Sequence, residues 1–406
     1  MTAFAQEDDE VSPYKEMKTL ARAVELIRQD YVDADKTGYE ELIYSALRGM
    51  LEELDPHSDF MDPKDFVGMQ EDTRSEFGGL GVVVGMKDER LTIVAPMEGT
   101  PGFRAGLLPD DVLLEIDGQS AEKMSLRDAV DKLRGDPGTT VKLAVGREGE
   151  PKPLKFEVER EVIKVPSVRG AKVLEGEGPR IGYVRVTQFS EPTGKEFARA
   201  LNDLEEQGID ALVLDLRFNP GGLLGSAVEV AGEFLPGGAL VAYTEGRSPS
   251  AERRYLAPGK GRKPREYPVA VLVNGSSASG AEIVAGALKD SGRALLVGET
   301  TFGKGSVQSV VSLPDGSALR MTTAKYFTPG EQPIHEKGVA PHVLATMSAE
   351  DEARLLSMRR QEDLPAGTKR ENDGQVEDVP LQRAVDALRG VLLHAKEGTG
   401  KPSAEG

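Results

Sequence analysis

The chain has 406 residues, a formal net charge of −18 and no cysteine. This length is sufficient for two or three domains, and the negative charge argues against a nucleic-acid partner, because phosphate binding requires a basic face. The absence of cysteine is compatible with both the cytosol and the periplasm. The four histidines, His57, His335, His342 and His394, lie far apart, so we expect no metal site and no cofactor. No apolar run approaches the ~20 residues that a membrane-spanning helix needs.

The chain opens with a segment that resembles the end of a signal peptide. Ala3, Phe4 and Ala5 place two small residues in an A-x-A arrangement before the acidic run from Glu7 to Glu10. This arrangement is typical of a cleavage site, although it also arises by chance. We expect the apolar part of a signal peptide to have been removed.

Residues 12 to 75 are predicted to be helical. One apolar stripe at helical spacing runs from Leu20 to Ile27, and a second runs from Leu42 to Leu51. Taken by themselves, these stripes indicate core packing. The lone His57, which has no visible partner in the sequence, is interpreted as structural rather than catalytic.

After the helical segment the pattern changes to short strands and glycine-rich turns. The loop Gly78–Val82 (GGLGV) is followed by the segment AGLLPDDVLLEIDG and by a helix from Ser125 to Arg134. This order resembles a PDZ domain. The resemblance implies that the backbone N–H groups of Leu80, Gly81 and Val82 bind a terminal carboxylate, while the peptide adds as a strand beside the helix. Without the resemblance, the glycine loop is simply a flexible turn.

Strands and helices then alternate, which predicts an α/β fold with a mainly parallel sheet. The strands Ile181–Val186 and Ala211–Arg217 are separated by a helix from Thr193 to Gln207. The second strand ends at the loop Phe218–Gly222 (FNPGG), and a helix is predicted to begin near Leu224. A turn from strand through glycine to helix is well suited to binding an anion.

The stretch from Val269 to Gly305 repeats this arrangement. A strand, Val269–Val273, leads through small residues to a helix that is predicted to begin near Ser279, and a second strand, Ala294–Val297, leads to a loop containing Lys304. Parallel strands that are joined by a helix place both loops at the same carboxyl edge of the sheet. We therefore expect Ser279 and Lys304 to be able to meet.

A serine and a lysine that meet in this way can carry out nucleophilic catalysis. A serine hydroxyl is a poor nucleophile until a neighbouring base removes its proton, and lysine acts as that base only where burial lowers its pKa. The start of the helix after Ser279 would offer free N–H groups to a developing oxyanion. The alternative is that Ser279 only caps the helix.

A phosphate-binding loop is the competing interpretation of the lysine loop. Gly298 to Lys304 fits the pattern G-x-x-x-x-G-K-[ST] up to the lysine, but Gly305 stands where a hydroxyl residue must bind magnesium. The pattern also requires a helix after the lysine, whereas Ser306 to Leu313 is predicted to be a strand. We therefore reject nucleotide binding.

The two loops together resemble the catalytic core of the carboxyl-terminal processing proteases, also called the tail-specific protease family. The matching motifs are Ser277–Glu282 (SASGAE), which fits SASxxE, and Phe302–Gly305 (FGKG). The resemblance implies that Ser279 is the nucleophile, that Lys304 is the general base, and that Gln308 orients the lysine.

The same resemblance implies an oxyanion hole. One N–H comes from Gly222 in the DLRxNPGG loop and the other from Gly280, where the family usually has alanine. Asp215 and Arg217 are interpreted as braces of this loop rather than as part of the chemistry. His342 stands where the GVxPD motif of the family has aspartate, which should weaken a hydrogen bond or ion pair without affecting the dyad.

The chain is therefore predicted to be a multidomain α/β protein. Its expected parts are a helical N-terminal dimerisation segment (residues 1–76), a β-rich PDZ domain with helices (77–164), an α/β protease core with a mainly parallel sheet (165–347), and C-terminal helices with a polar tail (348–406). Within the core, residues 245–268 are expected to form a surface insertion. The tail from Glu397 is expected to be disordered.

The resemblance implies a serine endopeptidase that recognises the carboxyl-terminal tails of unfolded or loosely folded proteins through its PDZ domain. We expect a homodimer or higher homo-oligomer, with protein or peptide carboxyl termini as substrates and a regulatory adaptor as a possible partner. Together with the N-terminal remnant, the resemblance implies export to the periplasm or cell envelope. Two alternatives stay open: a catalytically silent PDZ scaffold, and a classical triad that uses His335 or His342.

Overall fold

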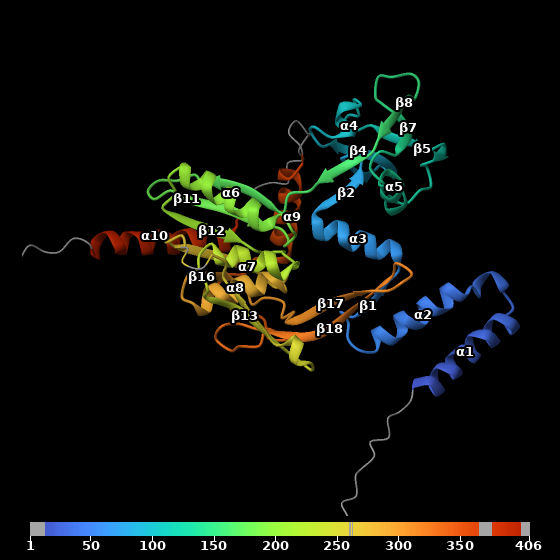
Figure 1. Cartoon of the computed structure of the whole chain (residues 1–406). Helices are drawn as coiled ribbons and strands as arrows, with labels where there is room; N and C mark the ends of the chain where they lie inside the picture. The colour runs from blue at the N-terminus through green and yellow to red at the C-terminus, as the bar shows by residue number, and fades with distance from the viewer. Residues whose placement is uncertain (1–12, 260, 262, 365–375, 399–406) are drawn as a thin grey trace, which may run out of the picture. The chain divides into compact units, whose positions relative to one another are not determined.

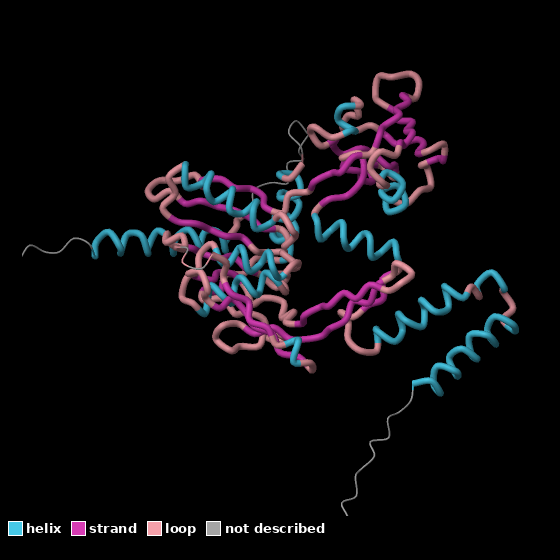
Figure 2. Tube along the Cα trace, in the orientation of Figure 1, coloured by secondary structure: helices cyan, strands magenta, loops and turns pink. Residues whose placement is uncertain are grey.

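The computed structural model describes residues 13–259, 261, 263–364 and 376–398, and the course of the chain is shown in Figure 1 and Figure 2. It contains two compact units: Met1–Val67 with Gln308–Thr323, and Gly68–Val307 with Ala324–Gly406. The predicted signal-peptide remnant at residues 3–6 lies outside the described residues. Among the helices of the described ranges, none combines the length and the apolar character that crossing a membrane requires.

The first unit begins with helices, as the apolar stripes predict. They are α1 (Pro13–Asp30), the short 3-10 helix η1 (Ala34–Lys36) and α2 (Tyr39–Glu52). The prediction that residues 12–75 are helical did not include β1 (Asp59–Met61), a strand that pairs antiparallel with the first residues of β18 (Ala318–Phe327). The N–H groups of His57 and Ser58 donate to Asp55 Oδ1 at 2.7 and 2.9 Å, and this turn leads the chain into the strand. A strand of 3 residues is too short to show a period in the sequence.

The segment predicted as a PDZ domain follows helix α3 (Pro63–Arg74) and contains two antiparallel sheets. The smaller sheet pairs β2 (Glu76–Gly79) with β9 (Glu161–Lys164). The larger consists of β3 (Val82–Lys87), β4 (Arg90–Pro96), β5 (Val112–Ile116), β6 (Gln119–Ser120), β7 (Thr140–Gly146) and β8 (Leu154–Glu159), accompanied by α4 (Pro101–Arg104) and α5 (Leu126–Leu133). Helix α5 buries Ala129 and Leu133 against Ile93 and Ile116 of this sheet, so strands and helix share one apolar core.

The central sheet of the second unit has six strands in the order β10-β11-β12-β15-β16-β19. They are β10 (Val168–Val173), β11 (Ile181–Val186), β12 (Ala211–Asp215), β15 (Val269–Val273), β16 (Ala294–Gly298) and β19 (Val343–Leu344). Neighbouring strands from β11 to β19 pair in parallel, and β10 pairs antiparallel with β11. The prediction of a mainly parallel sheet is therefore confirmed.

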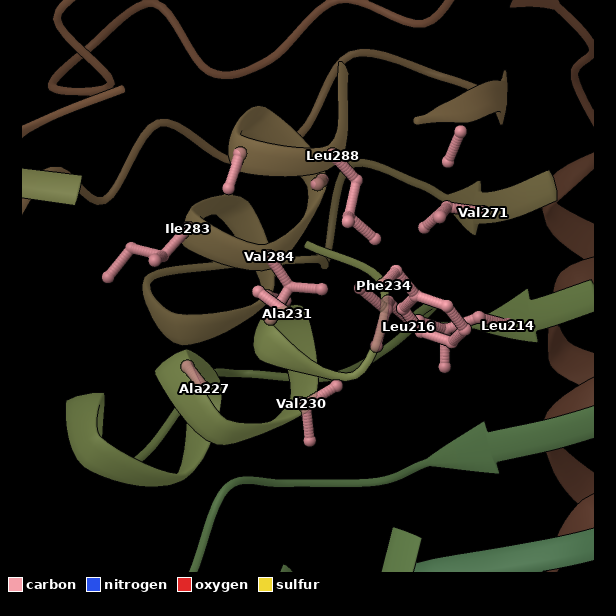
Figure 3. Packing of buried hydrophobic residues seen from close by; sticks show 14 of the residues in the cluster. Leu214, Leu216, Ala227, Val230, Ala231, Phe234, Val271, Ile283, Val284 and Leu288 are labelled. Atoms are coloured by element: carbon pink, nitrogen blue, oxygen red, sulfur yellow. The ribbon is translucent and has the colours of Figure 1, made fainter. Parts of the chain in front are cut away.

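Helices cover both faces of the central sheet. One face packs against α6 (Thr193–Glu206), α7 (Leu224–Gly232) and α8 (Gly280–Asp290), and the other packs against α10 (Val379–Gly398). The side chains of β12 alternate between the two layers: Leu214 belongs to the first and Val213 to the second. Figure 3 shows Leu214 beside Phe234 and close to the apolar residues of α7 and α8. Burial on both faces explains why these strands are continuous apolar runs in the sequence.

A second sheet contains β13 (Leu240–Gly246), β14 (Arg253–Leu256), β17 (Ser306–Ser312) and β18, and the remaining elements are η2 (Pro249–Ala251) and α9 (Ala349–Glu362). The expected surface insertion at residues 245–268 is wrong in part, because β14 lies inside it and pairs antiparallel with β13. Charged residues on this edge strand conceal its pattern. Helix α10 continues past Glu397, where a disordered tail was predicted, and residues 399–406 lie outside the described residues.

The two-layered core predicts that truncation of two leucines to alanine has very different effects on the free energy of unfolding. Leu214 is fully buried, whereas Leu256 on β14 is 50% exposed. We expect Leu214→Ala to lower the free energy of unfolding by about 2–5 kcal/mol, because it leaves a cavity between sheet and helices. Leu256→Ala should change it by less than about 0.5 kcal/mol. Urea unfolding of both variants measures the difference, and equal destabilisation would contradict this assignment of the core.

Candidate active site

Residues 274–279 connect β15 to α8 and are called the serine loop. This loop is hydrogen-bonded to the segment that follows β12. Asn274, which follows β15 and is buried, accepts the N–H of Phe218 on its Oδ1 at 3.0 Å. The Ser277 hydroxyl donates to the carbonyl of Leu216 at 2.9 Å, and the N–H of Ala278 donates to the carbonyl of Asn219 at 2.9 Å. Three hydrogen bonds therefore connect the serine loop with residues 216–219, the segment that follows β12.

Ser279 lies at the N-cap position of α8 and has a strained backbone. Its φ is 50° and its ψ is −111°, a region that non-glycine residues rarely adopt. Its neighbours Ala278 and Gly280 are buried, whereas Ser279 itself is half-buried. A sharp strand-to-helix turn that presents one serine at the edge of a sheet is also the geometry of a nucleophile elbow. The N-cap interpretation and the nucleophile interpretation thus apply to the same position.

The carboxylate of Glu282 joins the serine loop to the lysine loop. Its Oε2 accepts the N–H of Ser279 and the N–H of Lys304, both at 2.8 Å. Its Oε1 accepts the N–H of Gly303 at 2.7 Å and the hydroxyl of Thr301 at 2.5 Å. The amide nitrogens of Ser279 and Lys304 are therefore at most twice 2.8 Å apart. The structure thus brings together the two loops that the sequence predicts to meet.

Glu282 is fully buried, and its position in the helix has a simple local origin. It is the third residue after the N-cap Ser279, where a glutamate accepts the N–H of the cap residue in a capping box. Burial raises the pKa of Glu282, while the four donors oppose that shift. Glu282 belongs to the SASxxE motif, but the sequence by itself indicates no role for it. The spacing of serine and glutamate in SASxxE was the signal that could have found it.

A turn at residues 334–338 supports the lysine loop. The N–H of Glu336 donates to the carbonyl of Gly303 at 2.8 Å, and the N–H of Val339 donates to Thr301 Oγ1 at 2.7 Å. A Cβ at Gly305 would lie 2.2 Å from the backbone nitrogen of His335, so a side chain cannot fit there. The FGKG motif therefore needs its second glycine for close packing of two backbones.

The glycine loop after β12 lies directly against Ser279. A Cβ at Gly221 would be 2.6 Å from Ser279 Cβ and 2.9 Å from the nitrogen of Gly280. Gly221 has a φ of 102°, and its N–H already donates to Asn219 Oδ1 at 2.8 Å. A Cβ at Gly222 would lie 2.0 Å from the carbonyl oxygen of Phe189. Gly221 is therefore required by its packing against Ser279, and Gly222 by its packing against the backbone of Phe189.

Phe189 also explains why glycine, rather than the alanine that is usual in the resembled family, stands at position 280. A Cβ added at Gly280 would lie 2.9 Å from Phe189 Cδ2, and the phenylalanine is itself buried. The alanine that is usual in the family would press on this ring. Glycine at position 280 thus matches the phenylalanine at position 189.

Asp215 and Arg217 lie in a buried cluster of charges at the base of the glycine loop. The guanidinium Nη2 of Arg217 is 2.7 Å from Asp215 Oδ2, and its Nη1 is 2.7 Å from Asp378 Oδ1. Asp215 also accepts the hydroxyl of Tyr183 at 2.8 Å and pairs with Arg359 of α9. Burial alone would raise the pKa of Asp215, but the two guanidinium groups outweigh it and hold that pKa well below its usual value. These contacts suit residues that brace the loop.

The other candidates lie in different surroundings. Gln308 belongs to the first unit, where its Nε2 donates to Thr322 Oγ1 at 2.8 Å. His342 accepts the N–H of Leu296 on its Nδ1 at 3.0 Å, so an imidazole supplies the acceptor where the family has aspartate. The pKa of His342 is lowered mainly by burial and, to a smaller extent, by the positive charge of Lys289. The described residues hold no group of three or more side chains that could bind a metal ion.

Leu80, Gly81 and Val82 line a pocket of about 210 Å³ between β3 and α5. Val84 of β3 and Val130 of α5 also line it, so its wall is largely apolar. Gly81 has a φ of 67°, and a Cβ there would lie 2.3 Å from Thr100 Cβ. The glycine of this loop is thus required by its conformation. An apolar pocket next to a glycine-rich loop can accept the end of a peptide chain.

Three family models match the chain. They are peptidase family S41 over residues 180–345, the PDZ domain over residues 92–147, and the activating protease CtpB N-terminal domain over residues 2–65. Together with the fold, they define a serine peptidase that carries a PDZ domain.

Curated relatives match over nearly the whole chain. The carboxy-terminal-processing protease of Bartonella bacilliformis is 37% identical over 96% of this chain and 92% of its own length. The carboxyl-terminal-processing protease of Synechocystis is 37% identical over 93% and 84%, and the carboxy-terminal processing protease CtpB of Bacillus subtilis is 38% identical over 84% and 70%. The chain therefore belongs to peptidase family S41, the carboxy-terminal-processing proteases.

The contact between Gly221 and Ser279 predicts a loss of activity in Gly221→Ala. The new methyl group must displace either the glycine loop or Ser279, and a shift of about 1 Å in a reacting group can lower the rate about a hundredfold. Gly225→Ala is the matched control, because a Cβ at that position meets no atom within 4 Å beyond its chain neighbours and the backbone of its own helix. Values of kcat/KM for peptide hydrolysis measure the effect. Native activity in both variants would show that the loop tolerates the displacement.

The four hydrogen bonds to Glu282 predict that Glu282→Gln is strongly impaired. An amide nitrogen cannot accept an N–H, so one side of the bridge between the loops must open. A hydrogen bond to a charged group contributes about 1.5–3 kcal/mol, which corresponds to a fall in kcat/KM of about tenfold to about a hundredfold. Glu336→Gln, whose side chain is 85% exposed on the neighbouring turn, should keep native kcat/KM. Equal activity of the two variants would contradict a bridging role.

Proposed function

We propose that this serine peptidase hydrolyses peptide bonds with a dyad of Ser279 and Lys304, near the carboxyl termini of unfolded or loosely folded proteins. The observation that carries the proposal is the Glu282 carboxylate, whose one oxygen accepts the N–H groups of both residues at 2.8 Å. A shared acceptor keeps the two backbones in register. A dyad requires such a fixed separation, because proton transfer takes place only within hydrogen-bond reach.

In the proposed reaction, Ser279 Oγ attacks the scissile carbonyl carbon while Lys304 Nζ takes the hydroxyl proton. The tetrahedral oxyanion is then stabilised by backbone N–H groups. Collapse of this intermediate breaks the C–N bond, and the lysine ammonium gives its proton to the leaving amine. Water attacks the acyl-enzyme, Lys304 again accepts a proton, and Ser279 recovers it as the carboxylic acid leaves. Gln308 orients the lysine.

Gly222 and Gly280 are the proposed donors to the oxyanion. Gly280 is the first residue of α8, and the N–H groups of the first turn have no partner within the helix. In the glycine loop, the N–H of Gly221 is already taken by Asn219 Oδ1, which makes Gly222 the donor of choice. The peptide planes of both loops are held by buried contacts, so the donors need no reorganisation during the reaction.

The proposed substrate is the carboxyl-terminal tail of a protein. Leu80, Gly81 and Val82 would hold its carboxylate, and the apolar pocket beside α5 would take its last side chain. Export to the periplasm or cell envelope is proposed from the likeness to the carboxy-terminal-processing proteases, and a regulatory adaptor is a proposed partner. Homo-oligomerisation is proposed on the apolar surface of α1 and α2, where Met17 and Met50 are 61% and 53% exposed.

The test compares the native chain, Ser279→Ala and Lys304→Ala in cleavage of an unfolded protein with an apolar carboxyl terminus. Each substitution should lower activity by about a thousandfold or more. Lys337→Ala, which removes an exposed lysine from the neighbouring turn, should have no effect. Native activity should rise between about pH 6 and about pH 9, because only the neutral amine accepts the serine proton.

The outcomes separate the alternatives. Equal cleavage by native chain and both variants would overturn the dyad and turn attention to a triad with His335 or His342. Binding of carboxyl-terminal peptides that is unchanged in both variants, without cleavage by any of the chains, would favour the silent PDZ scaffold.

A further inference from the structure

Helix α9 lies beyond the segment that the protease family model matches, which ends at residue 345. It nevertheless contacts residues that support the candidate active site. Glu352 accepts the side-chain amide of Asn274 on its Oε1 at 3.2 Å, and Asn274 is the residue that holds the N–H of Phe218. One turn past Arg359, Asp363 pairs with Arg185 of the central sheet at 2.6 Å. The helix is thus attached at both of its ends.

Arg359 makes the central contact of this helix. It is 5% exposed, pairs with the carboxylate of Asp215, and its guanidinium lies 3.4 Å from the Tyr183 hydroxyl. The guanidinium carbon also lies 5.5 Å from the centre of the Phe218 ring, within the range of a cation–π interaction. Arg359 therefore contacts both the last residue of β12 and the first residue of the glycine loop.

Phe218 has a backbone that needs support. Its φ is 61°, which is unfavourable for a residue with a bulky side chain and persists only where the surroundings impose it. Three residues further on, Gly221 lies against Ser279 with no space for a methyl group. A change in the conformation of Phe218 would therefore shift the loop that presents its N–H groups to the oxyanion.

The surrounding charges are balanced. Asp215 and Asp378 are negative, Arg217 and Arg359 are positive, and Arg217 contacts both aspartates. Without Arg359, Arg217 would still pair with both Asp215 and Asp378, so the cluster would keep two ion pairs. Besides its polar contacts with Asp215 and Tyr183, Arg359 supplies a contact with the ring of Phe218.

We propose that Arg359 is a positioning residue for catalysis: from α9 it holds Phe218 in its strained conformation and so sets the oxyanion-binding loop against Ser279. This inference rests on the proposed function of that loop. It makes a C-terminal helix outside the matched protease segment a necessary part of the active enzyme.

The experiment uses the full chain with Arg359→Met, which keeps the apolar stem and removes the guanidinium. We expect kcat for peptide hydrolysis to fall about tenfold to about a hundredfold with KM nearly unchanged, because substrate binding is untouched while transition-state stabilisation is lost. Labelling of Ser279 by a small fluorophosphonate should slow by a similar factor. Arg354→Met, on the same helix and 46% exposed, is the matched control and should behave as the native chain.

A second variant separates positioning from charge balance. Arg359→Met with Asp378→Asn removes one charge of each sign and restores neutrality. We expect its urea midpoint to return toward the native value while kcat and labelling stay low. Arg359→Lys, which keeps a charge without the planar fork, should recover kcat only in part.

Three results would overturn the proposal: native kcat in Arg359→Met, recovery of kcat together with stability in the neutral double variant, or full activity in Arg359→Lys. Ser279→Ala is assayed in parallel. If Ser279→Ala is inactive while Arg359→Met is fully active, only the positioning role is wrong. If Ser279→Ala keeps native activity, the proposed dyad is wrong and the positioning role falls with it.

Discussion

The carboxylate of Glu282 is the interaction on which the candidate site depends. Two loops that follow different strands of the central sheet meet at one buried group, and each of its oxygens accepts two donors. A buried carboxylate is unfavourable unless it is fully hydrogen-bonded, so the four donors and the charge require one another. Either loop would leave Glu282 unsatisfied if it moved away alone. The geometry of serine and lysine is therefore maintained by a residue that takes no part in the proposed bond making.

Most of the site is built from backbone rather than from side chains. Ser279 and Phe218 adopt positive φ values without being glycine, while Gly221, Gly222 and Gly305 leave no room for a Cβ. Such conformations raise the energy of the folded state and persist only when the surroundings over-determine them. The surroundings here are the two-layered core below and the charge cluster beside it, which includes side chains from the C-terminal part of the chain. The stability of the core and of the charge cluster thus maintains the strained backbone conformations of Ser279 and Phe218.

The elements that position the site were predictable because they are long, apolar and regular. The strands Ile181–Val186 and Val269–Val273 have the predicted bounds, and the helix after Ser279 begins where small residues give way to helical spacing. The misses are short or charged elements: β1 has 3 residues, and β14 carries two arginines at the edge of a sheet. Neither contains enough residues of one character to show a period. The strand β14 is defined by its hydrogen bonds to β13 rather than by its own composition.

By itself, the sequence determined the order of strands and helices, the placement of Ser279 and Lys304 at one sheet edge, and the resemblance to the family. These depend on local patterns and on the handedness of parallel strand connections, which operate within short stretches of chain. Only the tertiary structure decided that Glu282 joins both loops, that Phe189 faces Gly280, and that Arg359 contacts Asp215 and Phe218. Those partners are distant in the chain, and no local pattern records a contact that forms only when separate elements pack together. The fold class thus follows from the local periodicity of the sequence, whereas the contacts that hold the site in place form only when the elements pack together.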